Sequence, residues 1–306
     1  MYLAPDDAKT DVILAAATAV LGVTLRGFVT TLPFYPRPGL AATLLDLAWV
    51  VVLTALVPVL LARHRRDGAA GFGFTGASVA TSLRDGLLLA VPAAVIGLGG
   101  PLLIGSTPGD ALLGRIAARS PVTACFDLIC GVGWVVLAAG GVLILYGFLA
   151  VRARDGFPRS PDVPLARLMR VVGLGAVGVA GVAGVMRALV QWSWVAFLLV
   201  LLNVLGLAAI LLLVDRLVPV GPSVPRAAIA APLIVLVIAK VFAAGGLFRG
   251  DLLGALYTAG LGAGVVLTLA VLAQTRRGVA VAIPLVLVVH WLPTCYSPLT
   301  LASGLC

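Results

Sequence analysis

Glutamate is absent from this chain of 306 residues, so all 12 of its acidic residues are aspartates. Charged residues make up only 11% of the sequence, against about 25% in soluble globular proteins. Hydrophobic residues make up 61%, and the mean hydropathy is +1.16. The low charge excludes a soluble globular domain. The missing glutamate excludes any catalytic or metal site that depends on that residue.

Aromatic residues are also few, at 7%, and apolar residues do not alternate with polar ones over ten-residue stretches. Both absences argue against an outer-membrane barrel. A membrane-spanning helix needs about 20 apolar residues, because its backbone polar groups must be satisfied within the segment. The long apolar runs therefore predict an all-α, polytopic membrane protein, with one helical bundle that forms a single integral membrane domain over residues 1–306.

Nine segments qualify as candidate spans. They are residues 12–33, 41–62, 83–105, 121–151, 169–190, 193–215, 227–247, 252–274 and 278–296. The last segment is short and contains Pro284 and Pro293, so an arrangement with eight spans is the main alternative.

Lysine is nearly absent: 19 of the 21 basic residues are arginine. This bias, with the excess of alanine, glycine, valine and leucine, is typical of a bacterial protein from a GC-rich genome.

The basic residues lie mainly in short loops, which indicates membrane orientation rather than nucleic-acid binding. One set of alternate loops holds Arg63, Arg65, Arg66, Arg84, Arg152, Arg154, Arg159, Arg167, Arg170, Arg216, Arg226, Arg276 and Arg277. The opposite loops hold Arg37, Arg115, Arg119, Arg187 and Arg249.

The positive-inside rule makes the richer set of loops cytoplasmic. It predicts a multi-pass protein of the cell membrane with a cytoplasmic N-terminus and, for nine spans, an extracytoplasmic C-terminus. The longest hydrophilic stretch, residues 152–168, is then a cytoplasmic loop that is too short to fold alone.

Five ionisable residues from five predicted spans fall at a similar depth in the outer half of the bundle: Arg26, Asp46, Asp127, Lys240 and His290. Charges inside a membrane are expensive and are functional candidates by default. We therefore consider an outward-opening polar pocket in which Asp46, Asp127, Lys240 and His290 are catalytic candidates and Arg26 binds ligand. The alternative is that each residue extends to the interface or forms a structural ion pair.

Lys240 has only apolar neighbours in the sequence. A desolvated lysine loses its proton more easily and can act as a base or a nucleophile, although such a lysine more often pairs with a carboxylate.

The four cysteines all fall near the predicted extracytoplasmic side, where disulfides persist. They are Cys125, Cys130, Cys295 and Cys306, and their spacing leaves three pairings open. Asp127, Cys130 and Trp134 share one helical face, which makes Cys130 and Trp134 ligand-binding candidates, with small buried hydrophobic residues as the alternative.

The two histidines, His64 and His290, lie on opposite sides of the predicted membrane and cannot share a metal. We therefore predict no metal site and no cofactor.

Residues 71–76 match the pattern G-x-G-x-x-G. A dinucleotide fingerprint requires a preceding strand and a following helix within a strand–helix–strand unit. This segment lies instead in a predicted loop between membrane helices, so the match does not indicate nucleotide binding.

The order of segments resembles the CPBP family, the CAAX-protease-like intramembrane peptidases. The cytoplasmic arginine cluster followed by Gly71-Phe72-Gly73-Phe74 and then an amphipathic helix entry carries the resemblance. A later family motif, E-E-x-x-F-R-G, corresponds to the segment 141–147. Gly141 and Val142 then stand where the family has its paired glutamates, and Tyr146 stands in place of the motif arginine.

Two further helices extend the resemblance. The family's F-x-x-x-H helix corresponds to Leu236 to Lys240, with lysine in place of histidine, and its H-x-x-x-N helix corresponds to His290 to Thr294, which follows an Arg276-Arg277-Gly278 turn. Thr294 is therefore a further ligand-binding candidate. The resemblance covers residues 42–150 and 227–295. It implies the family's scaffold without its peptidase site, because the glutamates that activate water are missing.

Three functions follow as hypotheses. The first is a non-peptidase membrane protein that binds a partner protein or a lipid-like molecule within the bundle. The second is an enzyme that acts on a lipid or isoprenoid-like substrate, with Asp46 or Asp127 as general acid or base. The third is a transporter, in which Pro284 and Pro293 break a helix at the binding site.

Overall fold

A computed structural model describes residues 4–29, 31–33, 45, 48–49, 51–74, 79–103, 140–217, 223–243, 250–275 and 280–284. The described part is mainly helical, with connecting turns and one short two-stranded ribbon. This confirms the all-α prediction. Three described helices are long and apolar enough to cross a membrane: Pro5–Val29, Arg167–Val190 and Trp194–Arg216. The larger number of spans stays a prediction.

The helices and strands follow in chain order. They are α1 (Pro5–Val29), η1 (Val52–Leu56), α3 (Val57–His64), η2 (Ala69–Phe72), α4 (Val79–Leu103), helix 140–156, β1 (Asp162–Pro164), α7 (Leu165–Val190), α8 (Trp194–Leu217), β2 (Ser223–Pro225), α9 (Arg226–Ala243) and α10 (Leu252–Thr275).

Six predicted spans coincide with α1, α4, α7, α8, α9 and α10 to within a few residues at most boundaries. The start of α1 differs most, since it begins at Pro5 rather than at residue 12. Proline is tolerated at the first helical position, and Asp6 and Asp7 suit the positive end of the helix dipole. The connection between helix 140–156 and α7 spans 157–164, which is shorter than the expected loop 152–168.

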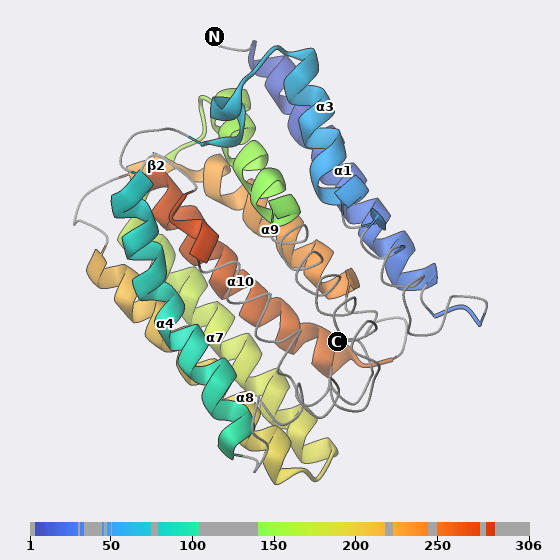
Figure 1. Ribbon diagram of the computed structural model, residues 1–306, viewed down its shortest axis with the longest axis vertical. Coiled ribbons are helices and arrows are strands. Elements are labelled where there is room, and N and C mark those ends of the chain that lie inside the picture. Colours follow the sequence, from blue (N-terminus) through green and yellow to red (C-terminus); the bar gives the residue numbers. More distant parts are fainter. Residues whose placement is uncertain are drawn as a thin grey trace, which may run out of the picture.

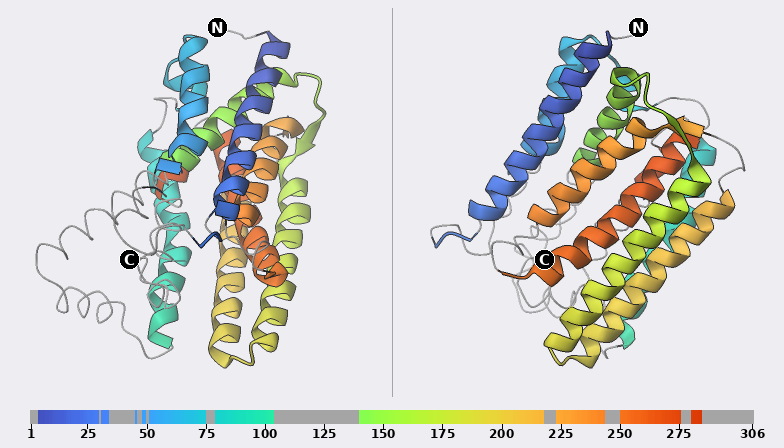
Figure 2. Two further views of the ribbon diagram at one scale, coloured as in Figure 1. Left: turned by 90° about the vertical axis from the view of Figure 1, so that its right-hand side faces the viewer. Right: turned by 180° about the vertical axis from the view of Figure 1, so that it is seen from behind.

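The helices form a broad bundle in which each packs on its neighbour (Figure 1). From one edge to the other, α1 packs on α9, α9 on α10, α10 on α7, and α7 on α8, while α4 packs on α8. Figure 2 shows the same order from behind, with α1 and α3 together at one edge. The helices run between the two ends of the bundle, and the N-terminus lies at one of these ends.

Small residues bring the central helices close together. Gly260 of α10 faces α7, and a Cβ atom at this position would lie 2.6 Å from the backbone nitrogen of Ala180. On α1, the buried stripe Ala8, Ala15 and Ala19 faces inward at helical spacing. Without a strong hydrophobic force between helices in lipid, such close backbone contact is what favours association.

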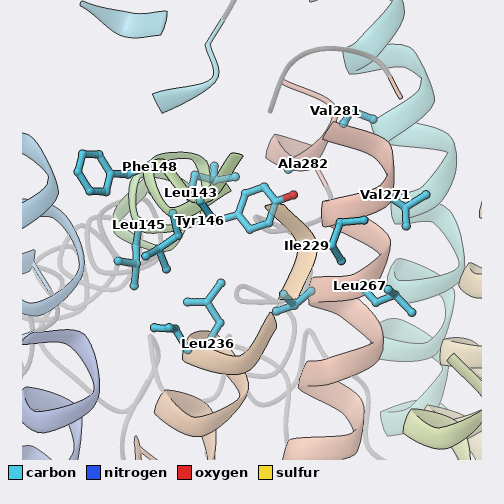
Figure 3. Packing of buried hydrophobic residues seen from close by; sticks show 14 of the residues in the cluster. Leu143, Leu145, Tyr146, Phe148, Ile229, Leu236, Leu267, Val271, Val281 and Ala282 are labelled. Atoms are coloured by element: carbon cyan, nitrogen blue, oxygen red, sulfur yellow. The ribbon is translucent and has the colours of Figure 1, made fainter. Parts of the chain in front are cut away.

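The core gathers around helix 140–156, α9 and α10. Figure 3 shows the Tyr146 ring reaching from helix 140–156 toward Ala282 and Ile229. Tyr146 is fully buried, as are Leu145 and Leu267. The hydroxyl of Tyr146 makes no hydrogen bond with the described residues.

Large apolar side chains also cover the outside of the bundle. Leu21 is 68% exposed, Leu174 is 72% exposed and Leu212 is 66% exposed, and they belong to α1, α7 and α8. Extended exposed apolar surface of this kind marks contact with a membrane or with another protein.

Candidate functional site: a buried ionic cluster

Arg152 lies near the end of helix 140–156 and is only 2% exposed. Its Nε atom lies 3.3 Å from Oδ2 of Asp11 on α1. Its Nη2 atom donates a hydrogen bond to Oδ2 of Asp67, which follows α3. One buried guanidinium therefore holds two carboxylates from two other segments of the chain.

Arg65 completes the cluster from the C-terminal end of α3. Its Nη2 atom lies 3.4 Å from Oδ1 of Asp11 and 3.2 Å from Oδ1 of Asp7. Asp11, which is 1% exposed, thus bridges two guanidinium groups. Desolvation opposes the charge of Arg65, but the carboxylates of Asp11 and Asp7 outweigh it and raise its pKa above the ordinary value.

Helical periodicity explains why Asp11 and Arg152 are buried. Asp11 lies between Ala8 and Ala15 on the buried stripe of α1, so the stripe that packs inward carries the carboxylate with it. Arg152 follows Phe148 by four residues on the same helical face, and its guanidinium carbon lies 5.2 Å from the centre of that ring.

A tight turn after α3 positions Asp67. Arg66 has a positive φ of 57° and Gly73 one of 71°, so the chain reverses twice within a few residues. Phe72 then packs on Phe148, with ring centres 6.1 Å apart. At Gly147 a side chain would collide with the carbonyl oxygen of Phe72, so only glycine lets the turn approach helix 140–156 this closely.

The energetics of this cluster favour a structural role. A buried ion pair gains little net stability, because desolvation offsets the attraction, yet removing one partner costs about 3–5 kcal/mol. The cluster therefore acts as a latch: it joins α1, the segment 65–74 and helix 140–156 at the end of the bundle that carries the N-terminus.

A second polar group lies at the opposite end, between α7, α8 and α10. Arg187 pairs with Asp251 at 2.8 Å, and Oδ1 of Asp251 accepts a hydrogen bond from the backbone nitrogen of Gly254 at the start of α10. Within the helices, Nδ2 of Asn203 donates to the hydroxyl of Tyr257 at 3.0 Å.

Trp192 and Trp194 lie beside this second group and are 94% and 80% exposed. Tryptophan is enriched where a bilayer meets water, so the exposure of these two residues at the end of the bundle fits a membrane–water boundary.

Most of the predicted pocket lies outside the described residues: Asp46, Asp127, Cys130, Trp134, His290 and Thr294, together with the remaining cysteines. Lys240 is placed on α9 by its backbone alone, and Arg26 is half-buried in the last turn of α1. Their convergence on one pocket stays a prediction. Among the residues that the structure describes, no group of three or more histidine, cysteine or acidic side chains could hold a metal.

Sequence reasoning missed the ionic cluster, because it assigned Arg65 and Arg152 to loops and to membrane orientation alone. One signal was available: Asp11 falls in the same helical register as the small residues that α1 buries. The partner of Asp11 could not be read from the sequence, because Arg152 is more than 100 positions away and nothing in the pattern pairs them.

Comparison of the chain with protein-family models, with curated proteins and with solved structures gives no match.

Proposed function

We propose that this chain is a multi-pass protein of the cell membrane with eight or nine spans. In this proposal the N-terminus is cytoplasmic, and the protein is a non-peptidase scaffold of CPBP-like type that binds a partner protein or a lipid-like molecule within its bundle. The end with the ionic cluster is the cytoplasmic end.

The membrane part of the proposal rests on the outer surface of the bundle. Exposed apolar side chains on α1, α7 and α8 surround helices that are long enough to span a bilayer. Exposed arginines gather at the end with the N-terminus, while Trp192 and Trp194 lie at the other.

The scaffold part rests on one observation: the two segments that carry the family resemblance lie against each other. Phe72 of the segment 71–74 contacts Gly147 and Phe148 of helix 140–156, and the adjoining Asp67 pairs with Arg152. Contact between these two segments is compatible with the scaffold that the resemblance implies, because segments that pack on each other must keep their places in the bundle.

Two features of helix 140–156 support a binding role over peptide cleavage. Gly141 is buried at the first position where the resemblance implies an acid, and Val142 is half-buried at the second. The two acidic residues of the cluster, Asp11 and Asp67, instead form ion pairs with Arg152. Pairing of both carboxylates with a guanidinium group favours a structural role for them over activation of water.

Native mass spectrometry of the full chain, purified gently from its own membrane, tests the proposal. A retained lipid-like mass or protein subunit is expected. If the ligand is lipid-like and lies beside α9, Lys240→Ala removes the retained mass, whereas the surface change Arg63→Gln does not.

Two results would overturn the proposal. Release of the chain from membranes by alkaline carbonate would remove its membrane part. Turnover of a substrate that requires both His290 and Lys240 as proton-transfer groups would replace the scaffold with the enzyme hypothesis.

A further inference from the structure

A short, proline-rich ribbon joins the starts of two helices at the end of the bundle with the N-terminus. β1 pairs antiparallel with β2, so that Pro164 lies opposite Ser223 and Asp162 lies opposite Pro225. α7 begins directly after β1, and α9 begins directly after β2.

Hydrogen bonds fasten the ribbon to the start of α9. The backbone nitrogen of Arg226 donates to the carbonyl oxygen of Pro161 at 3.2 Å, and that of Ala227 donates to the hydroxyl of Ser160 at 3.1 Å. The prolines restrict the backbone dihedral angles of the ribbon, and these hydrogen bonds hold it against the start of α9. The ribbon therefore has less conformational freedom than an ordinary loop.

Four arginines surround this ribbon: Arg159, Arg167, Arg170 and Arg226. All four are exposed, and none forms an ion pair with any residue in the part of the chain that the structure describes. The ribbon itself carries a single acid, Asp162. Among the described residues, the surface around the ribbon therefore carries more positive than negative charge.

Several other cations at this end do have carboxylate partners. Arg65 and Arg152 belong to the ionic cluster, Arg84 lies 3.4 Å from Asp85, and Arg154 lies 3.5 Å from Asp155. The ribbon arginines differ from these in having no carboxylate partner among the described residues, so their charge can attract an anionic ligand.

The outer face of α7 continues from these arginines into an apolar surface. Arg167 and Arg170 lie one turn apart, and next along the helix come Val171, 66% exposed, and Leu174, 72% exposed. Guanidinium groups directly above exposed aliphatic side chains match a phospholipid, whose phosphate lies above its acyl chains.

We propose that the ribbon arginines bind the headgroups of anionic phospholipids in the cytoplasmic leaflet. This inference rests on the membrane placement proposed above. Arg167 and Arg170 contact phosphate at the edge of the bilayer, Arg159 and Arg226 add charge from the ribbon, and Val171 and Leu174 contact the acyl chains. Juxtamembrane arginines of this kind attract acidic lipids by charge.

Titration of the purified full chain with single lipids in neutral detergent, followed by native mass spectrometry, tests the inference. We expect dioleoylphosphatidylglycerol to bind at lower concentration than dioleoylphosphatidylcholine. The double variant Arg167→Gln/Arg226→Gln should weaken binding of the anionic lipid roughly tenfold, because each basic residue near an anionic surface contributes a several-fold factor. Arg167→Lys/Arg226→Lys should restore most of that loss.

The matched control removes the same charge from the same end. Arg63→Gln/Arg66→Gln changes two exposed arginines at the end of α3, away from the ribbon, and should change lipid binding by less than about twofold. Equal weakening in both double variants, or equal binding of the two lipids, overturns the inference. Displacement of the lipid by inorganic phosphate also overturns it, since the ligand would then be a free anion.

These outcomes are separate from the fate of the proposed function. Extraction of the wild-type chain by alkaline carbonate would contradict both the proposed membrane placement and the proposed lipid site. A chain that stays in the membrane but does not distinguish the two lipids would remove the lipid site alone.

Discussion

Arg152 and Asp11 form a buried ion pair, 3.3 Å between Nε and Oδ2, that joins helix 140–156 to α1 across 141 positions of sequence. Both side chains are almost completely inaccessible, at 3% and 1% exposure. Asp67 shares the same guanidinium, so that three segments meet at one cation.

Asp11→Asn should destabilise the protein strongly. The change leaves Arg152 and Arg65 with fewer negative partners in a buried site, and breaking a buried pair costs about 3–5 kcal/mol. Thermal unfolding in detergent measures the effect. Asp6→Asn is the matched control, because the Asp6 side chain is 95% exposed where it pairs with Lys9, and its loss should lower the unfolding midpoint only slightly. Equal midpoints for the two variants would show that Asp11 is not held by the cluster.

Gly147→Ala should destabilise the protein by about 1–3 kcal/mol, because the added methyl group collides with the carbonyl oxygen of Phe72 and forces the turn away from the helix. Gly178→Ala is the control, since nothing lies within 4 Å of a side chain at that helical position. It should be neutral or stabilising by up to about 1 kcal/mol, as expected for glycine to alanine in a helix. A neutral Gly147→Ala would mean that the segment 71–74 does not pack on helix 140–156.

Much of the helical structure could be predicted from the sequence, because a long apolar run favours a helix without help from distant residues. Apolar length locates α7, α8 and α10 to within a few residues, since each needs only its own hydrophobic run. The latch does not follow, because the pairing of Asp11 with Arg152 depends on which helices become neighbours. That choice is made by packing, through the small residues of α1 and Gly147, and not by any local pattern.

The candidate site, like the fold, could be predicted from the sequence only in part. The sequence predicted a polar pocket in the outer half, and the residues that define it lie mostly outside the described part of the chain. The sequence pattern did not indicate that the hydroxyl of Tyr146 is buried, although Tyr146 belongs to the segment that carries the family resemblance. Tyr146 lies within a hydrophobic run, and the environment of its hydroxyl oxygen depends on which helices pack around it.

Tyr146→Phe should leave stability unchanged or raise it by about 1–3 kcal/mol. The hydroxyl is fully buried and makes no hydrogen bond with the described residues, so its removal relieves a desolvation cost. Calorimetry or thermal unfolding of the variant provides the measurement. A loss of more than about 1 kcal/mol would reveal a partner for the hydroxyl and assign it a role in the bundle. Leu145→Ala serves as the positive control, since it removes buried apolar volume and should be costly.

The two ends of α7 should lie on opposite sides of the membrane. The helix has 26 residues and is therefore about 39 Å long, which exceeds the hydrocarbon thickness of about 30 Å. In a chain whose native cysteines are replaced by serine, Arg159→Cys should resist a membrane-impermeant maleimide in intact cells, and Gln191→Cys should react with it. Both should react after lysis. Equal labelling of the two in intact cells would contradict the proposed orientation.

The most direct test of the latch is a double-mutant cycle on Arg152 and Asp11. Arg152→Met and Asp11→Leu should each destabilise the chain by several kcal/mol, because each leaves buried charge without its partner. The double variant should be less destabilised than the sum of the two, with a coupling energy of about 1–3 kcal/mol from the direct contact. Such coupling would establish that the cluster joins α1 to helix 140–156. Additive effects would show that the two residues act independently and that the end of the bundle is held by other contacts.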